Sequence, residues 1–564
     1  MILQPVTDIA EICARHELKN VVLSPGSRCA PLTIAFARHP EMQVKTVSDE
    51  RAAAFIGLGM AQISGKASVL VCTSGTASYN YAPAVAEAFY QQIPLLVFTA
   101  DRPQEWIDQL DGQTIRQTNI YGQHIKKSFN FPPDLQHKDA IWHANRMVSE
   151  AINLAHAFPA GPVHINIPLR EPFYPNPDEV FSYSKDLKII RETENDFTLS
   201  DKQAANLTEG LKQFRKVLVV PGQQMPDKEL EQAISTFCAG NDTVLVSDII
   251  SNCFPEKAIT HHDVFLTAKN PATEQLQPDL VITFGKSVIS KNLKLFLRKS
   301  HGLQHWHIQP AGEVADTFQA LTTIIRCQPI SFFSQVKIEN GTENSEKPFS
   351  ALWQKQNARA EVFLQQFFLN KPFNEFSAYW YAMLALPENS LLHVANSMAV
   401  RYANLLGLPA NRNITVIANR GTSGIDGCTS TTVGNALESG KITTLFTGDL
   451  AFFYDRNGLW HNYLPGNLRI IIFNNQGGGI FRLIDGPANQ PELDEFFETR
   501  QLLQAENTAK DFGMRYFKCE TEEELAQILP QFYENTGAAI LEIMTNNLQN
   551  AAFFKEFKNS FETN

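Results

Sequence analysis

The chain is poor in the features that mark several classes of protein. Its 564 residues include eight cysteines, scattered without a Cys-x-x-Cys pair or a Cys/His cluster at zinc-ligand spacing. No apolar run approaches the roughly 20 residues that a membrane-spanning helix needs. Lys and Arg number 48 against 59 Asp and Glu, for a formal net charge of −11. We therefore expect free thiols, no membrane insertion and no nucleic-acid partner.

Several targeting and catalytic motifs are also missing. Residues 1–8 lack the basic start, long apolar stretch and small-residue cleavage site of a secretory signal, so we expect a cytoplasmic protein. The sequence contains no Gly-x-x-x-x-Gly-Lys-Ser/Thr phosphate loop, no Gly-x-Ser-x-Gly nucleophile elbow and no His-Glu-x-x-His. Gly57-Leu58-Gly59 begins a dinucleotide-binding pattern but lacks its third glycine. We interpret this segment as the interior of a closely packed helix.

Short apolar, β-branched segments alternate with longer stretches of helical character. This alternation is typical of βαβ units, which build parallel sheets. The expected strands form three groups: 20–24, 44–47, 67–73, 94–100 and 163–168; then 216–222, 243–248, 280–285 and 305–309; and finally 390–396, 414–419, 442–449, 468–474 and 538–544. We therefore expect an α/β protein of three doubly wound domains with mainly parallel sheets.

Two stretches that suit neither a helix nor a central strand separate these groups. The first, 171–178, contains three prolines, and the second, 338–348, is polar. They predict domains at 1–185, 186–347 and 348–564, in keeping with a chain too long for one hydrophobic core. The first and third groups are candidates for related folds.

The loops after the strands are where an open parallel sheet binds its ligands. Five of them are rich in Gly, Ser, Thr or Asn: 24–28, 73–77, 419–424, 448–450 and 474–479. Among these, Gly448-Asp449 precedes Asn474-Asn475 by a spacing that fits one helix and one further strand. Adjacent parallel strands would bring a carboxylate and a carboxamide together, and both are oxygen ligands that suit Mg²⁺. Taken alone, the same residues are compatible with ordinary turns and helix caps.

This arrangement resembles the motif of thiamine-diphosphate-dependent enzymes, which opens with Gly-Asp-Gly and closes with Asn-Asn. Leu450 replaces the second glycine of that motif. The resemblance implies that Asp449, the side chain of Asn475 and the backbone of Gly477 hold Mg²⁺ or Mn²⁺. It also implies a glutamate that activates the pyrimidine of the cofactor. Glu50 is the candidate, because it stands where a strand gives way to a small-residue helix, although a solvated Glu at a helix start has the same pattern.

Further segments narrow the resemblance to one family. They are 24–28, 48–51, 73–77, 99–103, 396–397, 419–427 and 474–481. Together they are similar to 2-succinyl-5-enolpyruvyl-6-hydroxy-3-cyclohexene-1-carboxylate synthases, whose motif reads Gly-Asp-Leu and so agrees with Leu450. In this family a bulky apolar side chain, here Ile425, bends the cofactor.

The resemblance implies two sets of binding residues. Those for the cofactor are Glu50, Thr73, Gly75, Ser397, Ser423, Gly424, Ile425, Gly448, Asp449, Leu450, Asn475, Gly477, Gly478, Ile480 and Phe481. Those for the substrates are Ser27, Arg28, Arg102, Gln113, Lys291, Ser397, Arg401, Arg420, Ile480 and Phe481. Arg binds carboxylates in a planar, bidentate manner, which suits dicarboxylate substrates. Gly112 stands where we expect an Asn, so a side-chain contact is missing there.

The implied reaction is the decarboxylation of 2-oxoglutarate and the addition of the succinyl-semialdehyde carbanion to isochorismate, in menaquinone biosynthesis. Because Glu50 and Asp449 fall in different domains, the resemblance implies a site shared between the subunits of a homodimer or homotetramer. Two alternatives stay open at this point. One is another thiamine-diphosphate-dependent 2-oxo-acid decarboxylase or carboligase, and the other is a non-catalytic binding module that keeps the fold.

Overall fold

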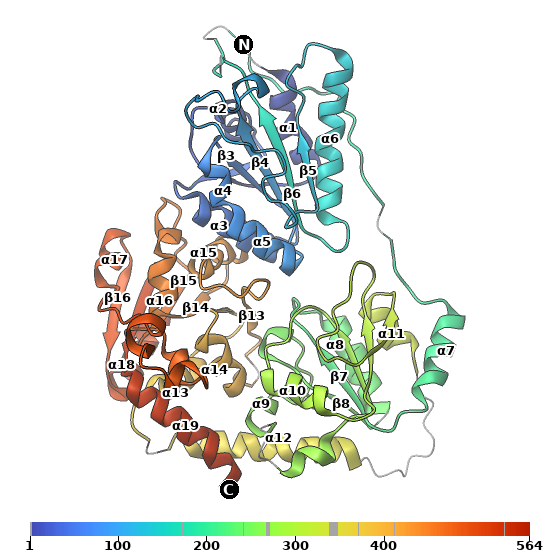
Figure 1. The fold of residues 1–564 in the computed structure, drawn as a ribbon, viewed down its shortest axis with the longest axis vertical. Helices are drawn as coiled ribbons and strands as arrows, with labels where there is room; N and C mark the ends of the chain where they lie inside the picture. The colour runs from blue at the N-terminus through green and yellow to red at the C-terminus, as the bar shows by residue number, and fades with distance from the viewer. Residues whose placement is uncertain are drawn as a thin grey trace.

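The computed structural model contains three sheets flanked by helices (Figure 1). It describes residues 3–171, 173–176, 179–193, 195–240, 242–266, 271–337, 348–369, 371–410, 412–534 and 536–563. Residues 172, 177 and 178 of the first expected linker and residues 338–347 of the second lie outside the described residues. We call the parts of the chain that build the sheets the first region (3–168), the second region (201–335) and the third region (348–563).

The first sheet is six-stranded and parallel, in the order β2-β1-β3-β4-β6-β5. Its strands are β1 (Asn20–Leu23), β2 (Gln43–Thr46), β3 (Ser68–Cys72), β4 (Leu95–Asp101), β5 (Lys127–Asn130) and β6 (Pro162–Pro168). Its helices are α1 (Gln4–Arg15), α2 (Ala30–Ala37), α3 (Glu50–Ser64), α4 (Thr76–Asn80), α5 (Ala82–Gln91), α6 (Lys138–His156) and the 3₁₀ turn η1 (Gln104–Trp106). The strands β3 and β4 are buried along their whole length, as expected for a parallel sheet covered on both faces.

The third sheet repeats this topology. Its order, β13-β12-β14-β15-β17-β16, is that of the first sheet when β12 is matched to β1. Its strands are β12 (Leu391–Val394), β13 (Thr415–Ile417), β14 (Thr443–Gly448), β15 (Leu468–Asn474), β16 (Arg515–Cys519) and β17 (Ala539–Met544). The first and third groups of strands therefore agree in order, as the sequence suggested.

The third region also contains most of the helices that surround the candidate site. Its α-helices are α12 (Pro348–Phe367), α13 (Glu375–Leu384), α14 (Met398–Leu406), α15 (Cys428–Ser439), α16 (Asp449–Tyr454), α17 (Glu506–Asp511), α18 (Glu522–Glu534) and α19 (Asn547–Thr563). Its short turns are η4 (Arg456–Leu459), η5 (Gly479–Arg482), η6 (Pro487–Asn489) and η7 (Leu493–Phe497). Both η5 and α19 follow strand ends, so they lie near the edge at which open parallel sheets bind their ligands.

The second sheet is five-stranded and parallel, in the order β11-β10-β9-β7-β8. Its strands are β7 (Val217–Pro221), β8 (Thr243–Leu245), β9 (Leu280–Phe284), β10 (Gln304–Ile308) and β11 (Leu321–Ile325). Its helices are α7 (Asp201–Leu211), α8 (Lys228–Gly240), α9 (His262–Phe265), α10 (Lys291–Lys299), α11 (Pro329–Gln335), η2 (Ile249–Ser251) and η3 (Pro271–Leu276). The predicted α/β class with three mainly parallel sheets is thus confirmed.

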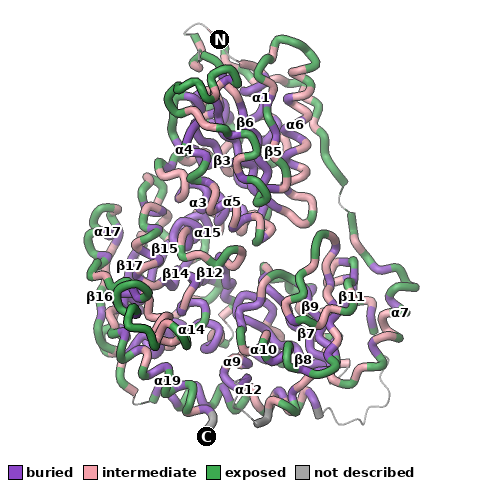
Figure 2. Tube along the Cα trace, in the orientation of Figure 1, coloured by how far each residue is buried: buried purple, intermediate pink, exposed green. Residues whose placement is uncertain are grey.

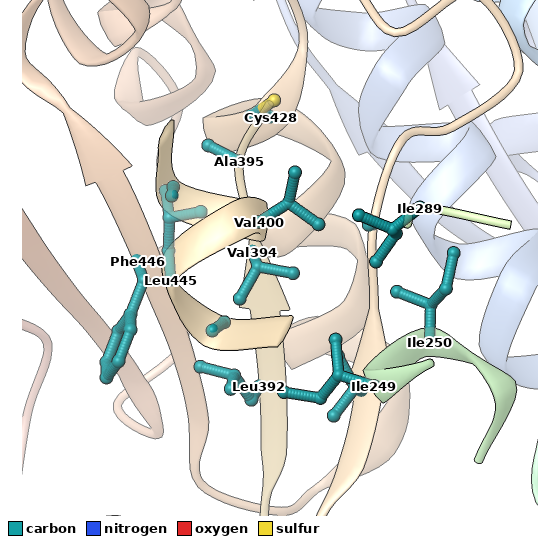
Figure 3. Packing of buried hydrophobic residues seen from close by; sticks show 14 of the residues in the cluster. Ile249, Ile250, Ile289, Leu392, Val394, Ala395, Val400, Cys428, Leu445 and Phe446 are labelled. Atoms are coloured by element: carbon teal, nitrogen blue, oxygen red, sulfur yellow. The ribbon is translucent and has the colours of Figure 1, made fainter. Parts of the chain in front are cut away.

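A continuous core joins the second and third regions. Figure 3 shows Ile249 and Ile289 of the second region beside Leu392 and Val400 of the third, and all four are buried. Figure 2 shows buried residues along the strands and in α3, α5 and α15, where the first region meets the third. Among the described residues, no helix is long and apolar enough to cross a membrane. All eight cysteines are free, as predicted.

The close packing predicted for Gly57-Leu58-Gly59 is confirmed in α3. A Cβ atom on Gly59 would lie 2.1 Å from the carbonyl oxygen of Thr431 in α15. From the other side, a Cβ atom on Gly434 would lie 2.1 Å from the carbonyl oxygen of Ile56. Two glycines therefore let the backbones of α3 and α15 touch, which fixes the helix that begins at Glu50 against the third region.

Replacing Gly434 by Ala should destabilise the protein by about 2 kcal/mol, because the new methyl group meets backbone that must shift. Urea unfolding followed by circular dichroism measures this. Gly240→Ala is the matched control, since a Cβ atom there meets nothing within 4 Å and its φ is not positive. Equal stability of Gly434→Ala and Gly240→Ala would contradict the close approach.

Candidate functional site

Two neighbouring strands of the third sheet end at the predicted metal ligands. The strands β14 and β15 pair in parallel, with Gly448 opposite Phe473. Asp449 is the first residue of α16, directly after β14, and Asn475 follows β15. The predicted pairing of these strands is therefore confirmed, and it places a carboxylate and a carboxamide at one edge of the sheet.

Protein donors orient the polar atoms at this edge. Asp449 is buried, and burial raises the pKa of its carboxyl to about 6. Gln501 Nε2 donates a hydrogen bond to Asp449 Oδ2 at 2.5 Å, and the Gly477 N–H donates to Asn475 Oδ1 at 3.2 Å. Among the described residues, no three His, Cys, Asp or Glu side chains group as a metal site. A cation held here would thus use one carboxylate together with amide and backbone oxygens, a set that suits Mg²⁺.

The glycine-rich turn after β15 leaves room beside these oxygens. A Cβ atom on Gly479 would lie 2.5 Å from Asn547 Oδ1 and 3.0 Å from Asn475 Nδ2. A Cβ atom on Gly477 would lie 2.9 Å from Glu498 Cγ. Among the described residues, the buried Asn547 Oδ1 has no hydrogen-bond donor. Glycine is therefore required in this turn, and the residues fit a bound metal and diphosphate.

Sequence analysis missed Glu375, which lies against the sheet edge that carries Asp449 and Asn475. Asn475 Nδ2 donates to Glu375 Oε1 at 3.1 Å, so the amide nitrogen points toward Glu375 and the amide oxygen away from it. Burial raises the pKa of Glu375 to about 8, and the neighbouring Asp449 adds to the shift. The Glu375 N–H donates to Asn550 Oδ1 at 3.0 Å, which ties the start of α13 to α19. No local motif marks Glu375, because it lies 100 positions before Asn475.

Glu50 begins α3 at the end of a loop from β2. Its neighbour Asp49 caps the helix by accepting from Ala52 N at 3.1 Å. The other carboxylate oxygen of Asp49 accepts from Asn457 Nδ2 of the third region at 2.8 Å. Asn80 Nδ2 donates to Glu50 Oε2 at 3.2 Å. The start of α3 is therefore held from both sides, and the Glu50 side chain lies at a cavity.

This cavity has a volume of about 440 Å³ and polar walls. Glu50, Thr73, Gly75 and Gln113 line it, so the structure brings together four of the predicted site residues. Within the described part of the chain, the buried hydroxyls of Thr73 and Ser74 have no hydrogen-bond partner. Both residues line the cavity, so its wall offers hydroxyl groups to a polar ligand.

Gly75 has a specific conformational role in this cavity. Its φ is +89°, in the region that favours glycine, and a Cβ atom would lie 3.3 Å from Gln113 Cα. Gln113 itself has a positive φ of 56°. The loop that carries Gln113 therefore passes directly over the start of α4, and the two backbones together shape one wall of the cavity.

Two predicted arginines of the first region are partly engaged by protein groups. Arg28 is buried, donates from Nη1 to Leu169 O at 2.8 Å and lies 4.5 Å from the centre of the Phe173 ring. Arg102 Nε lies 2.9 Å from Asp111 Oδ2, and Asp111 lines the cavity beside Glu50. Ser27 is exposed. These contacts fix both guanidinium groups near the ends of β1 and β4.

Arg420 lies in a loop that the first region holds in place. Its Nη1 donates to Asn396 Oδ1 at 2.8 Å. The next two residues donate from their backbone to Glu87 of α5, Gly421 N at 2.8 Å and Thr422 N at 2.6 Å. Glu87 is buried and was missed by sequence analysis, because it stands in the middle of a helix without a motif. The α5 carboxylate thus positions the loop after β13.

Two serines of the predicted site have strained backbone. Ser397, at the start of α14, has a φ of +70°, and Ser423 has a φ of +64°. Such conformations are uncommon for residues with a side chain and gather at ligand-binding sites. Asn396 Nδ2 donates to the carbonyl oxygens of Asn419 and Gly424 at 2.7 Å each, which joins the two loops. Ile425, beyond these loops, is a solvent-exposed apolar side chain.

Lys291, Arg401 and Ile480 line a second cavity of about 700 Å³ between the second and third regions. Lys291 is the first residue of α10, and Arg401 lies on α14 rather than in a loop. Arg401 Nη1 donates to the carbonyl oxygen of Ser397 one turn earlier. Phe481 follows Ile480 in η5, and its ring centre is 5.8 Å from that of Phe497. The structure therefore groups these residues away from the cavity beside Glu50.

A buried polar network fixes α14 to the second region. Asn404 Oδ1 accepts from Ile249 N at 2.8 Å, and Asn404 Nδ2 donates to Asp263 Oδ2 at 2.7 Å. Asp248 Oδ1 accepts from His262 Nε2 at 3.0 Å, and both residues are buried. The hydrogen bond from His262 helps to hold the pKa of Asp248 below its usual value, against the effect of burial. The second region thus sets the position of the helix that carries Ser397 and Arg401.

Family comparisons agree with this geometry. The family described as "Thiamine pyrophosphate enzyme, N-terminal TPP binding domain" matches residues 6–122, which include Glu50. The family described as "Middle domain of thiamine pyrophosphate" matches residues 186–394. Thiamine pyrophosphate is the thiamine diphosphate of the sequence analysis. The fold, the site and these matches define a thiamine-diphosphate-dependent enzyme.

Relatives that match along nearly the whole chain narrow this class to one family. A protein of Cytophaga hutchinsonii, named 2-succinyl-5-enolpyruvyl-6-hydroxy-3-cyclohexene-1-carboxylate synthase, is 46% identical over 565 residues, 99% of each chain. Proteins of the same name are 37% identical in Flavobacterium johnsoniae, over 97% of each chain, and 37% identical in Porphyromonas gingivalis, over 98% of this chain and 96% of the relative. The chain belongs to the 2-succinyl-5-enolpyruvyl-6-hydroxy-3-cyclohexene-1-carboxylate synthase family.

Proposed function

We propose that the chain decarboxylates 2-oxoglutarate and adds the remaining four-carbon unit to isochorismate, a step of menaquinone biosynthesis. The observation that carries this proposal is the edge of the third sheet, where a buried Asp449 and the oriented amide of Asn475 meet. Thiamine diphosphate supplies the nucleophilic carbon and the electron sink that decarboxylation requires. The name that the relatives share supplies the identity of the product.

We propose that Mg²⁺, or Mn²⁺ in its place, is held by Asp449 Oδ, Asn475 Oδ1 and the carbonyl oxygen of Gly477. Glu375 supports this arrangement, because it accepts from the Asn475 amide nitrogen and leaves the oxygen for the metal. The other predicted contacts to the diphosphate and thiazolium are Ser397, Ser423, Gly424, Ile425, Gly448, Leu450, Gly478, Ile480 and Phe481. The exposed Ile425 would gain apolar contact with the bound cofactor.

Glu50 is proposed as the catalytic acid in this site. Its carboxyl would hold a proton at the pyrimidine nitrogen N1′ of the cofactor, within the cavity that Thr73 and Gly75 also line. The unpaired hydroxyls of Thr73 and Ser74 support a polar ligand there. Asn80 donates to the Glu50 carboxylate, and the Asp49 cap fixes the start of the helix that carries it, so the carboxyl is positioned before the ligand binds.

We propose that the basic side chains bind the carboxylates of the two substrates. Arg401 and Ser397 would bind the carboxylate that 2-oxoglutarate keeps. Isochorismate would be bound by Ser27, Arg28, Arg102, Gln113, Lys291 and Arg420. Ile480 and Phe481 would exclude water from the reacting carbon. The held positions of Arg28, Arg102 and Arg420 support this role, because a guanidinium already fixed by protein oxygens loses little entropy on binding. The oxygens are the carbonyls of Leu169 and Gly112, the Asp111 carboxylate and the Asn396 amide.

We further propose that the complete site forms between two subunits. Within the described residues, the cavity beside Glu50 is lined by residues 25–115 and by none of the third region. Large apolar side chains near the two half-sites are more than half exposed: Trp106, Leu110, Phe496, Leu502 and Leu503. Exposed apolar groups of this size suit a protein interface, in a homodimer or homotetramer. The proposed domain boundaries, 1–185, 186–347 and 348–564, separate the pyrimidine half, the middle domain and the metal half.

The alternative is another 2-oxo-acid decarboxylase or carboligase of the same class. Its substrates carry a single carboxylate, whereas this chain places Lys291 and Arg401 at one cavity and Arg102 near another. Purified protein mixed with thiamine diphosphate, Mg²⁺, 2-oxoglutarate and isochorismate should release CO₂ and form the adduct, as measured by mass spectrometry. Turnover of pyruvate, or a flavin spectrum, without adduct formation would favour the alternative.

A further inference from the structure

The C-terminal helix α19 forms one wall of the 700 Å³ cavity between the second and third regions. The opposite walls come from α9 and α10 of the second region and from α14 and η5 of the third. In Figure 1 the red helix α19 runs along the third region toward α12 and the second region. The cavity that contains Lys291, Arg401 and Ile480 is therefore bounded by a helix to which sequence analysis assigned no role.

A third cation lines the cavity beside the two predicted substrate residues. Lys291 and Arg401 line it together with Lys558 of α19. In the part of the chain that the structure describes, none of these three cations forms an ion pair with a carboxylate. Three cationic groups around one cavity favour an anionic ligand.

Two carboxylates also line this cavity. Asp263 is engaged on both oxygens, since Oδ2 accepts from Asn404 Nδ2 at 2.7 Å and Oδ1 accepts from Ser290 Oγ. Asp485 is exposed. Positive charge is therefore in excess, with three cations to two carboxylates. Asp263 is already satisfied by protein donors, and Asp485 is the carboxylate that acts electrostatically on Lys558.

Aromatic packing fixes the position of Lys558. Phe554, Phe557 and Phe561 are buried on one face of α19. The ring of Phe557 lies 4.9 Å from that of Phe376 on α13, centre to centre, which anchors the helix to the third region. Lys558 Nζ lies 4.8 Å from the centre of the Phe554 ring, one turn earlier. The Lys558 side chain is therefore held against the cavity wall, while the residue stays exposed to an incoming ligand.

We propose that Lys558 is a substrate-binding and specificity-determining residue. Its ammonium group would bind, with Arg401, the carboxylate that 2-oxoglutarate keeps after CO₂ leaves. This inference rests on the proposed function and deepens it, because it assigns to α19 the selection of a 2-oxo acid with a second carboxylate over one with an uncharged tail. Contact with the Phe554 ring restricts the Lys558 side chain before a ligand binds, which lowers the entropy that binding costs.

The test compares Lys558→Met with Lys555→Met, whose side chain is exposed on the same helix and does not line the cavity. Lys558→Met should raise KM for 2-oxoglutarate about tenfold, the effect of losing one charge-assisted hydrogen bond, with kcat changed less than about threefold. Preference for 2-oxoglutarate over 2-oxopentanoate should fall by the same factor. KM for isochorismate should stay constant, and Lys558→Arg should keep most of the affinity.

Glutarate binding, measured by calorimetry, separates this inference from the proposed function. If the wild-type protein fails to consume 2-oxoglutarate but binds glutarate about tenfold more tightly than Lys558→Met, the proposed function is wrong and the cationic subsite stands. If Lys558→Met matches Lys555→Met in KM and in glutarate affinity, the subsite is overturned. An equal rise in KM for both substrates would also overturn it, because it would indicate a general structural effect.

Discussion

Replacing Glu50 by Gln is expected to lower kcat by about a thousandfold while the affinity for thiamine diphosphate changes less than about threefold. Gln has the same shape and can keep the hydrogen bond from Asn80 Nδ2, which measures 3.2 Å to Glu50 Oε2. It cannot give up or take a proton. Loss of turnover without loss of binding would therefore isolate the proton-holding role. Steady-state CO₂ release and quenching of tryptophan fluorescence by the cofactor measure the two quantities.

Glu41→Gln is the matched control for this experiment. Glu41 is an exposed glutamate of the same region, and it does not line the cavity beside Glu50. Its replacement should leave both kcat and cofactor affinity unchanged. If Glu50→Gln turned over 2-oxoglutarate at the rate of Glu41→Gln, Glu50 would be an ordinary acidic residue in the first turn of a helix, stabilised by the helix dipole.

The sequence predicted the strands that matter most for the site, and the physical reason is burial. All fourteen expected strands are present, and β3, β4, β7, β9 and β15 are buried along their whole length. A strand covered on both faces must be apolar throughout, so it is visible in the sequence. Boundaries moved by one to three residues, as at β2 and at the end of β8, because helix and strand ends depend on local hydrogen bonds.

The three strands that were missed, β5, β11 and β16, are edge strands. Each occupies one end of its sheet. Their burial alternates or is partial, and β5 carries the polar sequence Lys-Ser-Phe-Asn. An edge strand has a neighbour on one side only, so polar residues are tolerated there and the apolar signal is lost. None of the predicted site residues lies in the loop after any of these strands. Missing the strands therefore did not affect the prediction of the candidate site.

The residues of the candidate site also fall into two groups, those that the sequence predicted and those that it did not. Residues in strand-end loops, such as Asp449 and Asn475, were predicted because parallel topology alone brings strand ends together. Glu375, Gln501 and Glu87 were missed. Each hydrogen-bonds a predicted loop from a distant part of the chain, across 100, 52 and 334 positions respectively. Such contacts depend on tertiary packing, so no local pattern in one sequence identifies them.

Replacing Asp449 by Asn is expected to remove the response of the protein to Mg²⁺ and thiamine diphosphate without unfolding it. Burial raises the pKa of Asp449 to about 6, which indicates that its charged form is unfavourable without a cation. Asn keeps the shape and can still accept the hydrogen bond from Gln501 Nε2. The metal-free variant should therefore melt at the wild-type temperature or above it. The affinity for Mg²⁺ should fall more than about a hundredfold, and turnover with it.

Scanning fluorimetry with and without Mg²⁺ and cofactor measures this directly, because a ligand that binds the folded state raises Tm by mass action. The wild-type protein should show a Tm increase that Asp449→Asn lacks. Asp511→Asn, at an exposed aspartate of the same region, should retain the full increase. A Tm increase in Asp449→Asn equal to that of Asp511→Asn would mean that the buried carboxylate does not hold the metal. A lower melting temperature of the metal-free variant would instead mean that the protein's own donors, and not a cation, stabilise the charge of Asp449.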